Sequence, residues 1–255
     1  MMLLLLKEFI GQGYRELIKF VEISTIIQEI LELNDVPHYS TLCKFASRVD
    51  SKILNRIFKK TCNLMSIITD HVSVAAIDST GFVTDSASYY YSQRTEKLRK
   101  DYLKVTISVN TEDHSILAMK TTSSRCHDSQ VAIQVLRASH RTKSAEVYVM
   151  DKAYDSEAIH YFIHNNLKSD AIIPIRNWNA SYVSGIYRQK MAVDFDYDLY
   201  HKRNKVETVF SVIKRKFGEK IAARKYLTKL KEIKLKCIVY QLDLFLHYQR
   251  VFNVF

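Results

Sequence analysis

Glycine and proline are scarce in this chain, which has five Gly and two Pro in 255 residues. Flexible linkers and low-complexity tracts are usually rich in these residues, so neither is expected here. No segment recurs at the spacing of a solenoid repeat. A chain of this length that is 47% hydrophobic can bury a full core. The sequence therefore predicts a globular protein. Because no linker marks its domain boundaries, these must be found from changes in the hydrophobic pattern.

Paired cysteines and long apolar runs are absent as well. No two of the four cysteines form a C-x-x-C pair, which argues against a structural zinc site and a disulfide framework; they are Cys43, Cys62, Cys126 and Cys237. The opening MMLLLLKEF lacks the basic start and the length of a signal peptide. No stretch approaches the roughly 20 apolar residues of a membrane span. We therefore expect a soluble protein of the reducing cytoplasm, without a membrane partner.

Positive charge is concentrated in one segment. The net charge is +11, and residues 201–236 hold 13 Lys and Arg against 3 Asp and Glu, which accounts for +10 of it. A solvated helix face normally mixes its signs, whereas charge of one sign in one place is typical of proteins that bind a phosphate backbone. The segment indicates a nucleic-acid interface; an acidic protein partner or a plain basic surface is the alternative.

Residues 1–70 have the apolar spacing of helices, interrupted at NDVPHYS. Pro37 ends one helix, and Ser40 or Thr41 is expected to cap the next. Two short helices, a break and a third helix fit a helix-turn-helix that binds DNA. A plain helical bundle fits equally well, because the local charge is nearly balanced.

From residue 71 to residue 255 the pattern changes to strands alternating with helices. Three strand-like runs are followed by a helix, a strand, a helix, a strand and basic C-terminal helices; the strands are expected at 71–78, 103–110, 115–122, 145–151 and 170–176. This order predicts an α/β fold, with one mixed five-stranded sheet flanked by helices.

Two aspartates end strands of the predicted sheet. Asp78 closes the first strand and Asp151 closes the fourth, so both are expected at the carboxyl edge, where open α/β sheets bind ligands. Either one alone would be a turn or cap residue. With Glu207 on a facing helix they would form an oxygen-only cluster, which suits two Mg²⁺ ions acting on a phosphodiester.

Glu207 lies in the basic segment YHKRNKVETVFSVIKRKFGEK, residues 200–220. On a continuous helix with ~100° per residue, Tyr200, Arg203, Glu207 and Lys214 fall within a stripe about 60° wide. This stripe would align a carboxylate and several phosphate-binding groups along a nucleic-acid backbone. The simpler alternative is an ion pair between Arg203 and Glu207. The remaining cations expected to contact DNA are Lys202, Lys205, Arg215 and Lys216.

The spacing Y-(2)-R-(3)-E-(6)-K of these four residues resembles the signature of bacterial and archaeal transposases of insertion-sequence families four and five. AIDSTGF at 76–82 is similar to the first acidic block of that family, and residues 149–177 are similar to the second. The N-terminal helices are similar too, so the resemblance covers nearly the whole chain.

The resemblance implies an RNase H-like core with a DDE triad of Asp78, Asp151 and Glu207. Such enzymes use two Mg²⁺ or Mn²⁺ ions to cut double-stranded DNA at the terminal inverted repeats and to join the ends to target DNA. It also implies DNA contacts by Tyr200, Arg203 and Lys214, a homodimer in a synaptic complex, and a place at the prokaryotic nucleoid. The alternatives are an RNase H-like nuclease without strand transfer and an inactive or domesticated DNA-binding protein.

Weaker candidates have simpler explanations. His160 and His164 have helical spacing for a metal, but without a third ligand in pattern they are expected to be core or surface residues. Asp128 in RCHDSQ is expected to cap a helix. The tyrosines at 89–91 could stack on DNA or simply form a loop cluster, and Trp178 is expected to be a loop aromatic.

Overall fold

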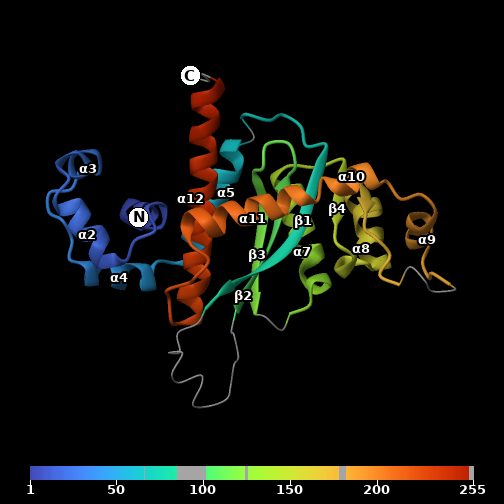
Figure 1. Ribbon diagram of the computed structural model, residues 1–255, viewed down its shortest axis with the longest axis horizontal. Coiled ribbons are helices and arrows are strands. Elements are labelled where there is room, and N and C mark those ends of the chain that lie inside the picture. The colour runs from blue at the N-terminus through green and yellow to red at the C-terminus, as the bar shows by residue number, and fades with distance from the viewer. Residues whose placement is uncertain (66, 85–101, 124–125, 178–181, 253–255) are drawn as a thin grey trace, which may run out of the picture.

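A computed structural model describes residues 1–255 apart from 66, 85–101, 124–125, 178–181 and 253–255. In Figure 1 the helices before residue 49 lie on one side of the long helix α12 (Tyr226–Phe252), and the sheet lies on the other. Helix α11 (Asn204–Phe217) runs across the sheet. Among the helices of the described residues, none is long and apolar enough to cross a membrane.

The N-terminal region is all-helical, as predicted. Leu17 and Val21 recur at helical spacing and are fully buried, and Leu235 of α12 completes the same apolar core. The region therefore packs on the C-terminal helix. Its helices are α1 (Met2–Ile10), α2 (Tyr14–Glu22), α3 (Thr25–Ile30), α4 (Tyr39–Arg48) and α5 (Ser51–Met65).

The expected cap of α4 is wrong by two residues. The ring of His38 accepts from the backbone N–H of Ser40, so His38, and not Ser40 or Thr41, caps the helix that begins at Tyr39. A histidine nitrogen can replace a hydroxyl oxygen as the acceptor of a free N–H of the first turn. The helix-turn-helix interpretation of this region remains a prediction.

Five strands form one mixed sheet in the order β3-β2-β1-β4-β5. The pairs β1–β2 and β2–β3 are antiparallel, and β1–β4 and β4–β5 are parallel. This confirms the predicted α/β class, with a mixed five-stranded sheet flanked by helices. The strands are β1 (Val74–Val83), β2 (Tyr102–Asn110), β3 (Ile116–Ser123), β4 (Val147–Met150) and β5 (Asp170–Ile172).

Helices cover both faces of the sheet. Because side chains alternate along a strand, Ala76 on β1 packs with α5, α11 and α12, whereas Ile77 packs on the other face with α7 and α8. The remaining helices are α7 (Asp128–Thr142), α8 (Glu157–Tyr161) with its π-helical continuation η2 (Phe162–Leu167), α9 (Ile186–Val193) and α10 (Tyr197–His201).

Strand β1 is longer than predicted, so Asp78 does not terminate it. The strand runs on to Val83 because its antiparallel pairing with β2 continues to the pair Val83–Tyr102. The segment STGFV after Asp78 contains Thr, Phe and Val, which favour strands. Strand β5 is shorter than predicted; Pro174 follows two residues after its end and has no N–H to donate.

The basic segment is not one continuous helix. Helix α10 ends at His201 and α11 begins at Asn204. Across the junction, backbone bonds join residues three apart, from Arg203 N–H to Tyr200 O (2.9 Å) and from Val206 N–H to Arg203 O (3.0 Å). A tighter turn changes the angle per residue, so the projected stripe holds from Asn204 onward but not for Tyr200.

Lys236 holds the C-terminal end of α11. Only 3% of this residue is exposed, and its ammonium donates to the carbonyls of Phe217 and, at 2.9 Å, Gly218. The last carbonyls of a helix lack intrahelical partners, and a cation there also opposes the helix dipole. One of the thirteen cations in the basic segment therefore has a purely internal role.

We predict that Lys236→Met lowers the free energy of unfolding by about 2 kcal/mol, because it leaves buried carbonyls without a charged donor. Urea denaturation measures this directly. Lys225→Met, on an exposed residue at the start of α12, is the control and should stay within about 0.5 kcal/mol. Equal effects of the two substitutions would contradict the capping role.

Candidate active site

Asp78 and Asp151 lie next to each other where β1 and β4 separate. The parallel ladder ends at the pair Ile77–Met150, so the next residue on each strand is a carboxylate. The residues two positions earlier on both strands belong to the core that α11 covers. Since side chains alternate, Asp78 and Asp151 both project toward α11.

The Asp78 carboxylate is held from two sides. Its Oδ1 accepts from the backbone N–H of Ser79 at 2.7 Å, and its Oδ2 accepts from Arg203 at 2.7 Å. Burial raises the pKa of Asp78 to about 6; the Ser79 N–H and Arg203 oppose this rise, and the negative charges of Asp151 and Glu207 add to it. These carboxylates are thus close enough to repel one another.

Arg203 bridges two of the three candidate carboxylates. One guanidinium nitrogen contacts Asp78, and the other contacts Glu207 Oε1 at 2.6 Å. The simple ion pair between Arg203 and Glu207 therefore exists. It is also part of a larger arrangement, because the same side chain reaches a strand 125 positions away in the sequence.

The donor chemistry of this cluster fits a divalent cation. Its ligating atoms are carboxylate oxygens, which Mg²⁺ prefers. A positive charge, the Arg203 guanidinium, already lies between Asp78 and Glu207. As they stand, no three His, Cys, Asp or Glu side chains of the described residues are gathered closely enough to hold a metal ion. Metal binding would thus require Arg203 to release Asp78.

An open cleft of about 630 Å³ lies against this cluster. Two of the candidate carboxylates, Asp78 and Glu207, line it together with Lys214 and Arg215. The Lys214 ammonium pairs with Glu219 at 3.0 Å and lies 5.5 Å from the centre of the Phe82 ring. The cleft therefore brings one carboxylate of β1 together with one carboxylate and two cations of α11.

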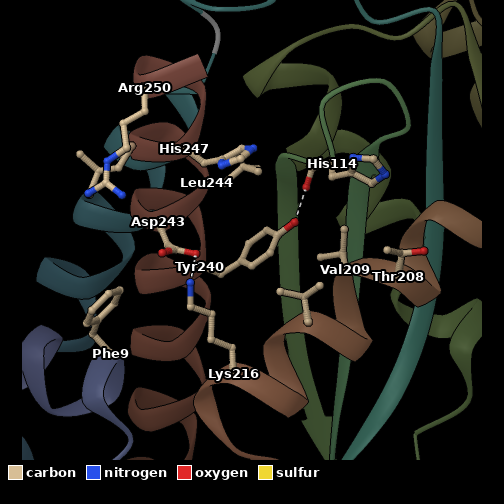
Figure 2. Close-up of a pocket in the computed structure, with 12 residues that line it drawn as sticks. Phe9, His114, Thr208, Val209, Lys216, Tyr240, Asp243, Leu244, His247 and Arg250 are labelled. Atoms are coloured by element: carbon tan, nitrogen blue, oxygen red, sulfur yellow. Dashed lines mark hydrogen bonds and ion pairs between the residues drawn. The ribbon is translucent and has the colours of Figure 1, made fainter. Parts of the chain in front are cut away.

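Lys216 lies in a different cavity, shown in Figure 2. This cavity of about 420 Å³ is formed between α11, α12 and the β2–β3 turn. The Lys216 ammonium pairs with Asp243 of α12 at 2.6 Å and lies 5.7 Å from the centre of the Phe9 ring. The sequence grouped Lys216 with Lys214 and Arg215, but the helix turns it away from their cleft.

The other predicted DNA contacts differ in exposure. Lys202 and Lys205 are exposed near the start of α11. Tyr200 is partly buried against the core under α11, and its ring centre lies 5.9 Å from the Arg203 guanidinium. Lys231, like Lys236, points inward and donates to the Ser47 carbonyl at the end of α4 (2.6 Å). The outward-facing charge is therefore smaller than the composition suggests.

His160 and His164 do not form a metal site with a third side chain of the described residues. Their rings are stacked with centres 6.4 Å apart, and His164 also stacks on Tyr187 at 4.5 Å. His160 is completely buried. Burial lowers the pKa of His160 to about 4, so this ring is a neutral core residue at neutral pH.

Two interactions near Asp151 have no signal in the sequence. Tyr154 reaches Ser79 through their hydroxyls, and Asp155 forms a bidentate ion pair with Arg188. The segment KAYDS at 152–156 does not indicate either partner. The expected cap of α7 at Asp128 is wrong, because the helix begins at Asp128 and its cap is His127, whose ring accepts from the Ser129 N–H. The tyrosines at 89–91 and Trp178 lie outside the described residues.

Comparison with known proteins gives one family. Residues 72–242 match the family described as transposase DDE domain, over a range that includes all five strands, α11 and most of α12. A search of the curated proteins found no match. Among solved structures, a match is the "Mos1 transposase paired-end complex with left transposon end", at 11% identity and a TM-score of 0.30, covering 90% of this chain and 74% of that chain.

We predict that His160 makes folding stability fall in acid. Its pKa is about 4 when folded and roughly 6.5 when unfolded, so the unfolded chain binds the proton more tightly. The free energy of unfolding should therefore drop by up to about 3 kcal/mol between pH 6.5 and pH 4 and level off below. Urea titrations across this range measure the effect. The fall in the free energy of unfolding should be missing in His160→Leu and should remain in the control His247→Leu, which changes an exposed residue.

Proposed function

Because the chain belongs to the transposase DDE-domain family, we propose that it is the DNA transposase of an insertion sequence. It cuts double-stranded DNA at the terminal inverted repeats and joins the ends to target DNA. The observation that carries this proposal is the register of β1 and β4, which directs Asp78 and Asp151 toward α11, where Glu207 is joined to Asp78 through Arg203.

In this proposal Asp78, Asp151 and Glu207 are the metal ligands and the catalytic carboxylates. Two bound Mg²⁺ ions, with Mn²⁺ as a substitute, would activate the attacking oxygen and stabilise the leaving oxygen. The carboxylates of this chain hold no proton when the ions are bound, since metal ligands must be deprotonated.

Arg203 has two roles in this mechanism. Without metal its guanidinium neutralises Asp78 and Glu207, which keeps the carboxylates from repelling one another. With cations bound at the carboxylates, the Arg203 guanidinium would be free to form a bidentate contact with a DNA phosphate. Tyr200 lies close enough to orient it.

DNA would lie along the cleft beside α11. Lys214 and Arg215 line this cleft and would contact phosphates flanking the scissile bond, while Lys202 and Lys205 extend the contact along the backbone. Two copies of the chain, one on each transposon end, would form the synaptic complex. The protein would act at the prokaryotic nucleoid.

The decisive experiment is a strand-transfer assay with a supercoiled plasmid that carries the ends of the element. Mg²⁺-dependent joining of ends to target DNA supports the transposase. Nicking without joining would instead indicate an RNase H-like nuclease, and binding without cleavage would indicate an inactive or domesticated DNA-binding protein.

We predict that Asp78→Asn, Asp151→Asn and Glu207→Gln each abolish cleavage, because each removes a charged ligand of the ions. DNA binding should persist within about threefold, as measured by gel shift in Ca²⁺. Asp170→Asn, an exposed carboxylate at the start of β5, serves as the control with unchanged cleavage. Full activity in any one of the three variants would remove that residue from the triad.

The two sides of α11 should contribute unequally to DNA binding. Lys214→Ala and Arg215→Ala should each weaken binding and reduce the slope of log Kobs against log salt by about 1, because each removes one phosphate contact. Lys216→Ala changes a residue in the separate cavity of Figure 2 and should leave that slope nearly unchanged. Fluorescence anisotropy at several salt concentrations compares the three, and a slope change confined to Lys216 would reverse the assignment.

A further inference from the structure

The backbone pairing between β1 and β4 stops just before the two aspartates. Its last pair is Ile77–Met150. After Asp151 the chain leaves the sheet in the 3₁₀ turn η1 (Lys152–Tyr154), closed by a bond from Tyr154 N–H to the Asp151 carbonyl at 2.9 Å. No ladder bond therefore holds Asp78 and Asp151 at a set separation.

A buried chain of hydroxyls occupies the position after this last pair. Tyr154 is fully buried, and its hydroxyl lies 2.9 Å from Ser79 Oγ. Ser79 Oγ in turn lies 2.7 Å from Thr106 Oγ1 of β2. The chain lies on the face of the sheet opposite to the carboxylates, because Ser79 alternates with Asp78 along β1. It ties the turn after β4 to both β1 and β2.

Ser79 connects this chain to the candidate site. Its hydroxyl bonds Tyr154, while its backbone N–H donates to Asp78 Oδ1 at 2.7 Å. Tyr154 is itself bonded through its N–H to the residue that begins the turn, Asp151. One path of short contacts thus runs from the Asp78 carboxylate, through Ser79 and Tyr154, to the backbone carbonyl of Asp151.

The turn is also fixed on its far side. The Asp155 side chain is 1% exposed, receives two bonds from Arg188 at 2.6 and 2.8 Å, and accepts the Arg176 backbone N–H at 2.9 Å. Asp155 thus anchors the turn to α9, and the contact between Tyr154 and Ser79 holds the same turn against β1.

We propose that the Tyr154–Ser79 hydroxyl pair is a positioning element that sets the separation of Asp78 and Asp151, and thereby the affinity of the site for divalent cations. This inference rests on the proposed function, because it takes both aspartates as metal ligands. Tyr154 touches neither DNA nor metal in this role. It acts through the orientation of the ligands, an effect known to change metal affinity about 10- to 100-fold when such supporting contacts are removed.

The test compares Mn²⁺ binding by the full-length wild-type chain and Tyr154→Phe, which deletes one oxygen and keeps the buried ring. Free Mn²⁺ measured by electron paramagnetic resonance should show a dissociation constant about tenfold higher in the variant. Ser79→Ala should give the same shift. The double variant should bind Mn²⁺ no more weakly than Ser79→Ala alone, because Ser79→Ala already removes the contact with Tyr154. Cleavage by Tyr154→Phe should recover at saturating Mn²⁺.

Ser169→Ala is the matched control. Ser169 is also buried and donates its hydroxyl to the Ala145 carbonyl at 2.7 Å, near the start of β4 and β5 and thus away from the aspartates. Its Mn²⁺ affinity should equal that of the wild type. A loss equal to that of Tyr154→Phe would mean that general destabilisation is the cause, which overturns the positioning role.

The remaining outcomes separate this inference from the proposed function. If the wild type binds Mn²⁺ in a manner that Asp78→Asn abolishes, but Tyr154→Phe binds equally well, only the positioning role is overturned. If the wild type shows no such binding, the proposed function fails and the inference with it. Should thermal melting show that Tyr154→Phe is unfolded, the smaller change Ser79→Ala decides the question alone.

Discussion

The parallel pairing of β1 with β4 is the constraint on which the candidate site depends. Its register places Asp78 and Asp151 one position beyond the pair Ile77–Met150 and on the same face of the sheet. A slip of one residue on either strand would turn one carboxylate to the opposite face, since side chains alternate with a period of two. Buried neighbours on both faces of β1 make such a slip costly.

Electrostatic balance around these carboxylates comes from Arg203. Asp78 is buried near two other negative charges, and such a cluster is unfavourable unless a cation accompanies it. The guanidinium supplies that cation in the metal-free protein through its contacts with Asp78 and Glu207. In the proposed function, the same residue would bind a DNA phosphate once the carboxylates hold cations.

The basic segment also serves two purposes. Lys231 and Lys236 point inward to the carbonyl ends of α4 and α11, so part of the positive charge holds the helices around the sheet. Lys214 and Arg215 face the cleft beside the carboxylates. Lys231 and Lys236 stabilise the C-terminal ends of α4 and α11. Helix α11 in turn presents Lys214 and Arg215 to the cleft.

The α/β class, the five strands and the common helix face of Glu207 and Lys214 followed from the sequence alone, because periods of 2 and 3.6 residues record which face of an element is buried. Local sequence could not show that β1 continues past Asp78, since that depends on its pairing with β2. It also could not show which partner each charged side chain meets. Arg203 reaches Asp78 across 125 positions, Lys231 reaches Ser47 across 184, and Tyr154 reaches Ser79 across 75. Contacts of this range arise only when the packed elements bring distant residues together.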